Sequence, residues 1–161
     1  MVYFKTAFNE GFTLTPTNVA HQIGHGMELE TLWDIDQQTQ FYGSYSYQDN
    51  QDQTTNTDIG YAPHHLLLAR LQRQQKPWFF SIQARYVGLR DRGFTDPRPR
   101  TEPYTIIDGL VRYEIASDFE VSFDIRNLFD ADAVDDSPGV LLPSDISLSG
   151  RTFYFTLLHR F

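Results

Sequence analysis

One segment of the chain, residues 89–103, gathers the side chains best suited to bind an anionic ligand. It contains three prolines and four arginines: Arg90, Arg92, Arg98 and Arg100. A guanidinium group presents planar, forked donors that match carboxylate and phosphate groups. The segment therefore predicts a binding site for an anionic ligand. The alternative is an ordinary exposed loop whose charges serve no ligand.

The five histidines do not predict a metal site. His64 and His65 are adjacent, so a strand would direct them to opposite faces. His21 and His25 are four residues apart, which suits a helix, but a strand would separate them by about 13 Å. We expect no metal and no cofactor, and structural or interfacial roles for most of these side chains. His64 remains a candidate ligand contact near the rim of the predicted sheet.

A second loop, residues 129–150, is acidic and contains Asp130, Asp132, Asp135, Asp136 and Asp145. Their order lacks the alternating aspartates and the glycine of a calcium loop. A solvated acidic loop is expected, and contact with a divalent ion or a cationic ligand is the alternative. The chain has no nucleophile elbow, zinc-protease, phosphate-loop or dinucleotide motif. We therefore assign no catalytic residue and do not expect an enzyme.

Composition narrows the class of protein further. The net charge of −8 argues against nucleic acid as a partner, and the absence of cysteine excludes disulfides and thiolate metal sites. The mean hydropathy is −0.43, and no run of about 18 apolar residues could form a transmembrane helix. The first eleven residues carry no export signal. Because the features below favour an exported protein, we expect the chain to be the C-terminal part of a longer one.

The last eleven residues, R-T-F-Y-F-T-L-L-H-R-F, alternate as a strand with one apolar face. That face carries Phe153, Phe155, Leu157 and Phe161. The segment is about as long as a tilted strand that crosses a bilayer. A terminal aromatic suits the strand that closes an outer-membrane barrel, where it can lie at the membrane interface. These four residues are therefore expected to act in barrel assembly.

The same alternation recurs in seven earlier segments: residues 2–8, 19–35, 39–48, 65–72, 78–87, 105–115 and 119–126. Short turns near residues 36, 74 and 117 alternate with long loops at 11–17, 49–63, 89–103 and 129–150. Mid-strand charges lie opposite the aromatic residues, which matters because an arginine facing lipid costs about 2–4 kcal/mol. The sequence thus predicts an all-β fold, an antiparallel up-and-down transmembrane β-barrel. The eight segments would be about eight C-terminal strands of a larger barrel, with the long loops outside the cell.

Several motifs occur in an order found in one protein family. Asn127-Leu128-Phe129-Asp130 is followed by Gly150-Arg151-Thr152-Phe153 and by a final strand that ends in Arg160-Phe161. Upstream lie G-M-E-L-E, Y-S-Y, P-H-H and R-Y-V-G. This series resembles the C-terminal barrel of TonB-dependent outer-membrane receptors over nearly the whole chain. Ser149 and His159 depart from it, at positions where proline and an aromatic residue are commoner.

The resemblance implies that residues 1–161 are the C-terminal part of a receptor barrel, without a plug domain, TonB box or signal peptide. The whole receptor would lie in the outer membrane of a Gram-negative bacterium and perform TonB-coupled uptake of a nutrient, most often a ferric siderophore. Expected partners are membrane lipid, the missing N-terminal barrel and plug portion, the TonB complex through that portion, the barrel-assembly machinery and a ferric-siderophore-like ligand. Two alternatives stay open: an autonomous eight-stranded outer-membrane barrel with a structural or adhesion role, and a soluble β-sandwich that binds a ligand.

Overall fold

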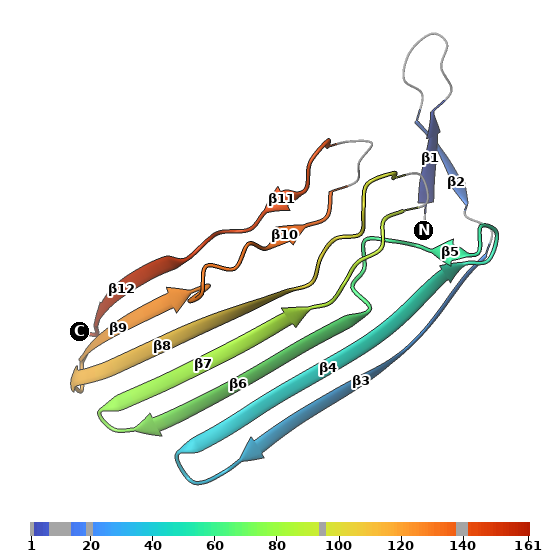
Figure 1. The fold of residues 1–161 in the computed structure, drawn as a ribbon. Helices are drawn as coiled ribbons and strands as arrows, with labels where there is room; N and C mark the ends of the chain where they lie inside the picture. The colour runs from blue at the N-terminus through green and yellow to red at the C-terminus, as the bar shows by residue number, and fades with distance from the viewer. Residues whose placement is uncertain (1, 7–13, 19–20, 94–95, 138–141) are drawn as a thin grey trace.

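The computed structural model describes residues 2–6, 14–18, 21–93, 96–137 and 142–161. Its main element is a curved antiparallel sheet with the strand order β12-β9-β8-β7-β6-β4-β3 (Figure 1). The long strands are β3 (Gln22–Asp34), β4 (Thr39–Asp52), β6 (His65–Gln75), β7 (Trp78–Val87), β8 (Tyr104–Ala116), β9 (Phe119–Arg126) and β12 (Thr152–His159). The two-residue strand β5 (Thr57–Asp58) pairs with β4. The predicted all-β antiparallel fold is confirmed.

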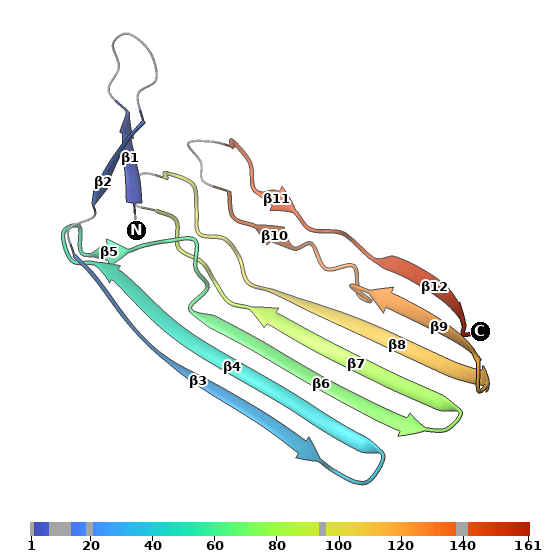
Figure 2. The same ribbon diagram turned by 180° about the vertical axis from the view of Figure 1, so that it is seen from behind.

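The connections follow the predicted alternation of short and long. Short turns join β3 to β4, β6 to β7 and β8 to β9 at one end of the sheet, here called the turn end. Residues 53–64, 88–103 and 127–151 form the long connections at the opposite end, here called the loop end (Figure 2). The last of these contains the short hairpin of β10 (Val134–Asp135) and β11 (Ile146–Ser147).

The N-terminal segment differs from its prediction. A strand forms at β1 (Val2–Thr6), but it pairs with β2 (Leu14–Asn18) in a separate two-stranded sheet. The sequence predicts a loop at residues 11–17 and a strand of the barrel wall at residues 2–8. Instead the sheet has seven long strands, and β3 forms its edge. Residues 7–8 of the predicted first strand, residues 11–13 of the predicted loop and residues 19–20 of the predicted second strand lie outside the described part.

The pairing register keeps side chains of one kind on one face. Leu29 opposes Tyr45, and Phe123 opposes Phe155, so apolar and aromatic side chains line up across the strands. Their neighbours in sequence form the other face, where Glu30 opposes Ser44. We call these the apolar face and the polar face. Charged side chains of the long strands thus gather on the polar face, but that face also carries aromatic residues: Arg70 lies over the ring of Tyr42, and Arg112 lies over that of Phe79.

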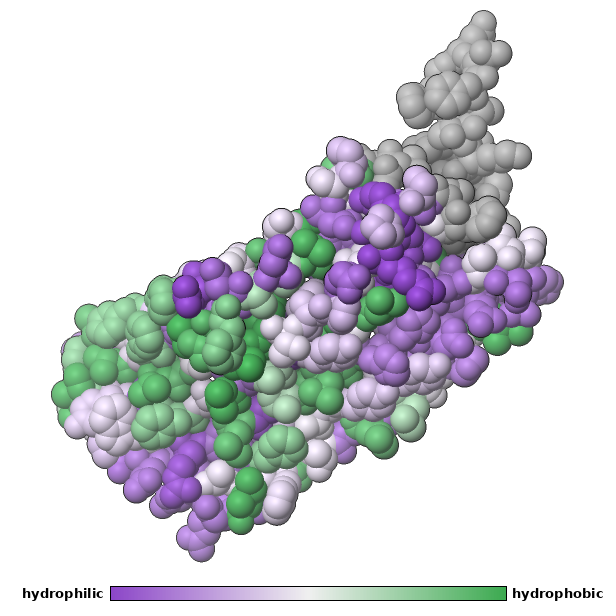
Figure 3. All heavy atoms as spheres, in the orientation of Figure 1, coloured by the Kyte–Doolittle hydropathy of each residue, from purple (hydrophilic) through white to green (hydrophobic). Residues whose placement is uncertain are grey.

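This sheet buries little of its apolar surface against itself. Among the described residues, the buried hydrophobic side chains are Val87, Ile106 and Ala133. Large apolar residues such as Leu29, Phe80 and Phe155 are instead between 42% and 68% exposed. The space-filling view shows hydrophobic residues gathered over β9 and β12, whereas the loop end is mostly hydrophilic (Figure 3). A continuous apolar face of this kind requires an apolar environment to cover it.

The sheet is open in the described chain, since β3 and β12 form its two edges and do not pair with each other. No helix in the described part is long and apolar enough to cross a membrane.

Candidate functional site at the loop end

The three long connections meet at the loop end, where irregular backbone is held by specific hydrogen bonds. Arg90 forms β-bridges with both Pro63 and Thr101. The amide of Tyr61 donates to the carbonyl oxygen of Asp91 at 2.7 Å. Residues 53–64 are thereby joined to residues 88–103, and the charged side chains of the latter are held in defined positions.

Arginines of residues 88–103 meet aspartates of residues 134–145. The guanidinium of Arg92 donates two hydrogen bonds to the carboxylate of Asp145, at 2.7 and 2.5 Å. Arg98 contacts the same carboxylate at 3.2 Å and also donates to the backbone carbonyl of Ser137 at 2.6 Å. The two loops are thus joined by bidentate and shared charged hydrogen bonds, which are among the stronger polar contacts in proteins.

Arg90 extends the same network into the interior of the loops. Its side chain is only 5% exposed, donates to the carbonyl of Val134 at 2.7 Å and lies 3.4 Å from the carboxylate of Asp136. The guanidinium also lies over the ring of Tyr104, 5.5 Å from its centroid. We call the combined network the loop clasp, and it comprises Arg90, Arg92, Arg98, Asp96, Asp136, Ser137 and Asp145.

The clasp shifts the titration of its own groups. The hydrogen bonds from Arg92 hold the pKa of Asp145 down to about 2. Arg98 does the same for Asp96, whose pKa lies well below its usual range, and the pKa of Arg98 is raised in return. The clasp contains three arginines and three aspartates, and a fourth aspartate, Asp135, lies 3.5 Å from Arg90.

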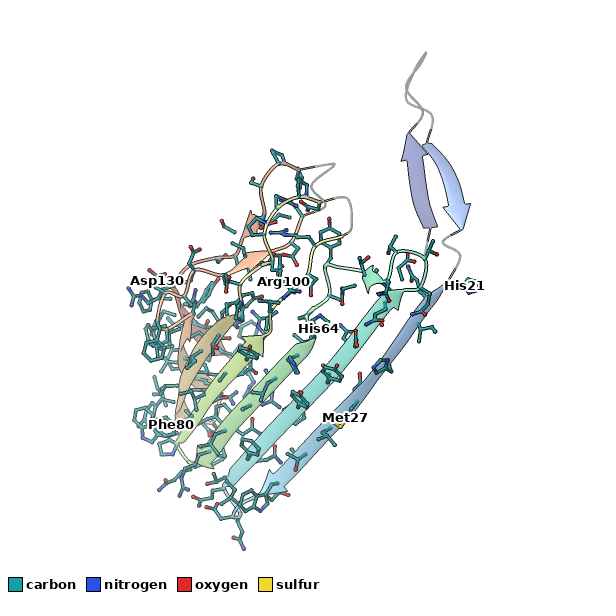
Figure 4. The ribbon with its side chains drawn as sticks, turned by 45° about the vertical axis from the view of Figure 1, so that its right-hand side comes forward. His21, Met27, His64, Phe80, Arg100 and Asp130 are labelled. Carbon is teal, nitrogen blue, oxygen red and sulfur yellow. The ribbon has the colours of Figure 1, made fainter. Side chains whose placement is uncertain are left out.

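Arg100 stands apart from the clasp. Its side chain is 65% exposed, and its Nε lies 2.6 Å from Asp91 Oδ1. The other oxygen of Asp91 lies 3.3 Å from Nε2 of His64, so one carboxylate links two of the residues singled out from the sequence. Figure 4 shows His64 and Arg100 beyond the strand ends on the same side of the sheet.

His64 sits among acidic groups. Its Nε2 lies 3.3 Å from Asp58 as well as from Asp91, and its Nδ1 lies 3.0 Å from the carbonyl oxygen of Gln48. Partial burial acts to lower the pKa of His64. The hydrogen bonds to Asp91 and Gln48 and the charge of Asp58 outweigh it, and the pKa is raised.

The segment that begins with Asn127 is ordered by its own side chains. Asn127 is 2% exposed, has a φ of 52° and exchanges two hydrogen bonds with the backbone of Ala131. Asp130, with a φ of 55°, accepts a hydrogen bond from the amide of Arg151. The left-handed region tolerates asparagine and aspartate better than most side chains. The N-L-F-D motif thus forms the turn that returns the chain toward β12.

The structure therefore brings together only some of the residues selected from the sequence. Arg90, Arg92 and Arg98 lie in the clasp, while Arg100 and His64 share Asp91. Sequence reasoning missed three acidic partners of these side chains, Asp58, Asp91 and Asp96, which carry no motif and follow no regular spacing.

The residues assigned to barrel assembly lie elsewhere. Phe153, Phe155 and Leu157 are exposed on the apolar face of the edge strand β12. Phe161 is fully exposed, and its ring centroid lies 5.8 Å from that of His159. Their role in assembly stays a prediction.

Comparison with solved structures identifies the fold. The copper transporter OprC superposes with a TM-score of 0.79 at 17% identity, covering 100% of this chain and 27% of that one. The ferric enterobactin receptor PfeA of Pseudomonas aeruginosa gives 0.74 at 16% identity, covering 99% and 26%. The ferric-catecholate import receptor Fiu of Escherichia coli K12 gives 0.74 at 21% identity, covering 99% and 23%. The chain thus spans about a quarter of the length of these proteins.

Sequence comparison supplies the family. No curated protein sequence matches the chain. The family model described as "TonB dependent receptor-like, beta-barrel" matches residues 3–128, which is well over half of the chain. Members of that family are transport receptors in the outer membrane of Gram-negative bacteria. The chain belongs to the TonB-dependent receptor β-barrel family.

Proposed function

We propose that this chain is the C-terminal part of the barrel of an outer-membrane receptor that takes up a ferric siderophore by TonB-coupled transport. The observation that carries the proposal is the two-faced open sheet, whose exposed apolar face needs lipid and whose polar face needs water or protein. Several superposed structures are named as receptors for ferric enterobactin, ferripyoverdine or ferric catecholates. Such ligands present anionic oxygens, which suit a loop end that displays arginine.

In this proposal each part of the chain has a distinct task. The apolar face contacts membrane lipid, and the polar face lines the lumen and meets the plug supplied by the rest of the receptor. The loop end faces the outside of the cell, with Arg100 the most accessible of the four arginines. The clasp holds the loops in a fixed arrangement around the ligand. The plug and the TonB contact belong to the N-terminal portion.

An uptake assay in the source bacterium tests this function. The gene is deleted, and cells grown under iron limitation are given ⁵⁵Fe complexed with catecholate, hydroxamate or mixed-ligand siderophores. Uptake of one class should be lost on deletion and on collapse of the proton gradient, and it should return with the intact gene. Undiminished uptake of every class would contradict the proposal.

A matched pair of variants tests the role of the loop end. Arg100→Ala should weaken binding of the transported complex to whole cells. Arg73→Ala is the control, because Arg73 also pairs with an aspartate, Asp36 at 3.4 Å, but lies at the turn end. Equal losses in both variants would show that Arg100 acts on folding and not on the ligand.

The autonomous eight-stranded barrel is the alternative, and it would require the predicted strand at residues 2–8 to join the sheet and pair with β12. In the described structure β1 pairs with β2 instead, and β3 and β12 are the edges of the sheet. In lipid, an unpaired edge leaves backbone groups unsatisfied at several kcal/mol each. An 18.7 kDa band in the outer membrane that shifts on boiling would favour the small closed barrel. A much heavier band detected by an antibody to residues 129–150 would favour the receptor.

A further inference from the structure

A second set of side chains at the loop end converges without forming part of the clasp. Asp49 in β4, Asp58 in β5 and His64 before β6 each offer one donor atom, and these three atoms lie within 4.8 Å of one another. We propose that the three residues bind a divalent first-row transition metal ion, with Zn²⁺ as the probe. The site does not depend on which nutrient the receptor transports.

The imidazole of His64 is oriented for coordination. Its Nδ1 lies 3.0 Å from the carbonyl oxygen of Gln48. A carbonyl oxygen can only accept, so Nδ1 carries the hydrogen and Nε2 is left with its lone pair when the ring is neutral. Metal-binding histidines characteristically donate their second nitrogen to a carbonyl or carboxylate in this way. The Gln48 side chain in turn donates to the carbonyl of Pro63 at 3.1 Å, which fixes the backbone just before His64.

Asp58 is held with one oxygen free. Its Oδ1 accepts the amide hydrogen of Gly60 at 2.6 Å, while Oδ2 lies 3.3 Å from Nε2 of His64. Two ligands of a tetrahedral ion with bonds of about 2.0–2.1 Å are separated by about 3.3–3.4 Å. The observed nitrogen–oxygen separation therefore matches the edge of a coordination tetrahedron.

The backbone around Asp58 is rigidly placed. Gly60 has a φ of +82°, and a Cβ added to it would come within 2.4 Å of the amide nitrogen of Gly93. Gly60 is therefore packed against the backbone of Arg92 and Gly93 in a way that only glycine allows. A ligand that is held at both ends loses little freedom when a metal binds.

Space and charge also favour a cation. A pocket of about 250 Å³ opens beside the site and is lined by Gln48, Asn50, Asp58, Gly60 and His64, among others. It is large enough for an ion with bound water. Two carboxylates and a neutral imidazole carry a charge of −2, which a divalent ion neutralises. Imidazole favours zinc, copper or nickel over magnesium and calcium, which prefer ligand sets made of oxygen.

Asp91 limits the site on its other side. Its Oδ2 is 3.3 Å from His64 Nε2, but its Oδ1 is bound by Arg100 at 2.6 Å. We therefore leave Asp91 out of the ligand set, because its charge is already paired with Arg100, and place Asp49 as the third ligand.

Metal titration of the protein tests the proposal. The protein is extracted from outer membranes in detergent, without a histidine tag, and Zn²⁺ is titrated against a competing chelator. His64→Gln keeps a donor for the Gln48 carbonyl but removes the ligand, and Asp58→Asn keeps the shape but removes the charge. Each should weaken Zn²⁺ binding by about 100-fold or more, since loss of even a supporting partner costs about 10- to 100-fold.

His159→Gln is the matched control, because His159 also lies near a carboxylate, Asp118 at 3.4 Å, but has only one such neighbour. It should leave the affinity unchanged. X-ray absorption of the zinc-loaded protein should show nitrogen and oxygen ligands at about 2.0–2.2 Å, and this readout does not depend on whether a variant folds. Unchanged affinity in the His64 and Asp58 variants, or a zinc ion surrounded by water alone, would overturn the site.

Discussion

The carboxylate of Asp130 accepts a hydrogen bond from the backbone amide of Arg151 at 2.7 Å, across 21 positions of sequence. The side chain of Arg151 returns to the same turn and donates to the carbonyl of Leu128 at 3.3 Å. Gly150 leaves room for the contact, because a Cβ there would lie 2.9 Å from the Asp130 carboxylate. The N-L-F-D motif at residues 127–130 and the G-R-T-F motif at residues 150–153 are therefore hydrogen-bonded to each other where the last strand begins.

Removal of this contact should loosen the start of β12. Asp130→Ala is expected to lower the free energy of unfolding by about 1 kcal/mol, the net contribution of a hydrogen bond whose charged acceptor is exposed to water. Asp130→Asn should lose less, since its amide oxygen still accepts. Urea unfolding in detergent measures the effect, with Asp132→Asn in the same loop as control. An unfolding midpoint of Asp130→Ala equal to that of the wild type would contradict the expectation.

The clasp should control the opening of the loops. Asp145→Asn removes the charge that holds both Arg92 and Arg98, so about 1.5–3 kcal/mol of stabilisation should be lost. The population of open loops should then rise about tenfold or more. Trypsin cleavage after Arg92 and Arg100 reports this opening. Asp118→Asn at the turn end should leave the cleavage rate unchanged, and an unchanged rate in Asp145→Asn would show that the clasp does not hold the loops.

Acid should release the clasp over a defined range of pH. The pKa of Asp145 is lowered to about 2, and that of Asp96 lies below its usual range. A carboxyl whose pKa is depressed by folding stabilises the fold fully above its unfolded value, near 4, and loses this as pH falls toward its folded value. The loops should therefore stay closed down to about pH 4 and open between about pH 4 and pH 2.

Spin labels can follow that transition, because the chain has no cysteine of its own. Labels on cysteines placed at Glu102 and Leu142, both exposed, would report the separation of the two loops. The distance should widen in the acid range for the wild type. Asp145→Asn should show a wide distribution already at neutral pH. A distance that changes around pH 6, or does not change at all, would contradict this assignment.

The two faces of β12 should respond oppositely to charge. Phe155 lies on the apolar face opposite Phe123, and Thr156 lies on the polar face opposite Ser122. Phe155→Arg should destabilise the membrane-inserted protein by about 2–4 kcal/mol, whereas Thr156→Arg should cost much less. Unfolding from lipid vesicles measures both. Similar losses in the two variants would contradict the assignment of the apolar face to lipid.

The strands could be predicted because alternation is a local property. In β4, β7 and β9, side chains two residues apart lie on the same face of the strand, so the sequence alone assigns each side chain to a face. The observed register between strands places matching faces side by side. Turns as short as residues 76–77 and 117–118 then leave little choice of partner. The short and long connections could be predicted as well, because they are the segments left between the alternating strands.

The N-terminal segment shows that local alternation predicts a strand but not its pairing partner. Alternation at residues 2–8 predicts a strand, which the structure shows at Val2–Thr6, but it contains no information about the strand's partner. The pairing of β1 with β2 depends on residues 14–18, whose sequence L-T-P-T-N contains a proline and resembles a loop. A local pattern therefore identified the element and misplaced it.

The site could be predicted only in part, for a related reason. Arginine and aspartate are recognisable in sequence, but Arg92 and Asp145 are 53 residues apart in segments without periodicity. No local pattern indicates that they meet, so the sequence offers these arginines only as candidate ligand contacts or as charges of an exposed loop. The sequence predicts His64 as a candidate ligand contact. Asp58 and Asp49, in contrast, lie in a polar segment that contains no motif for a metal site.

The strand order also has a kinetic consequence. Each long strand pairs with the next long strand along the chain, so every partnership in the sheet forms between close neighbours in sequence. Folding of such a meander can proceed one hairpin at a time, at low contact order. The edges β3 and β12 are the exception, because neither pairs with a second long strand in the described part of the chain. An edge strand of this kind can pair with another chain. Protection of these two edges should therefore limit the rate of folding and the extent to which the protein aggregates as it folds.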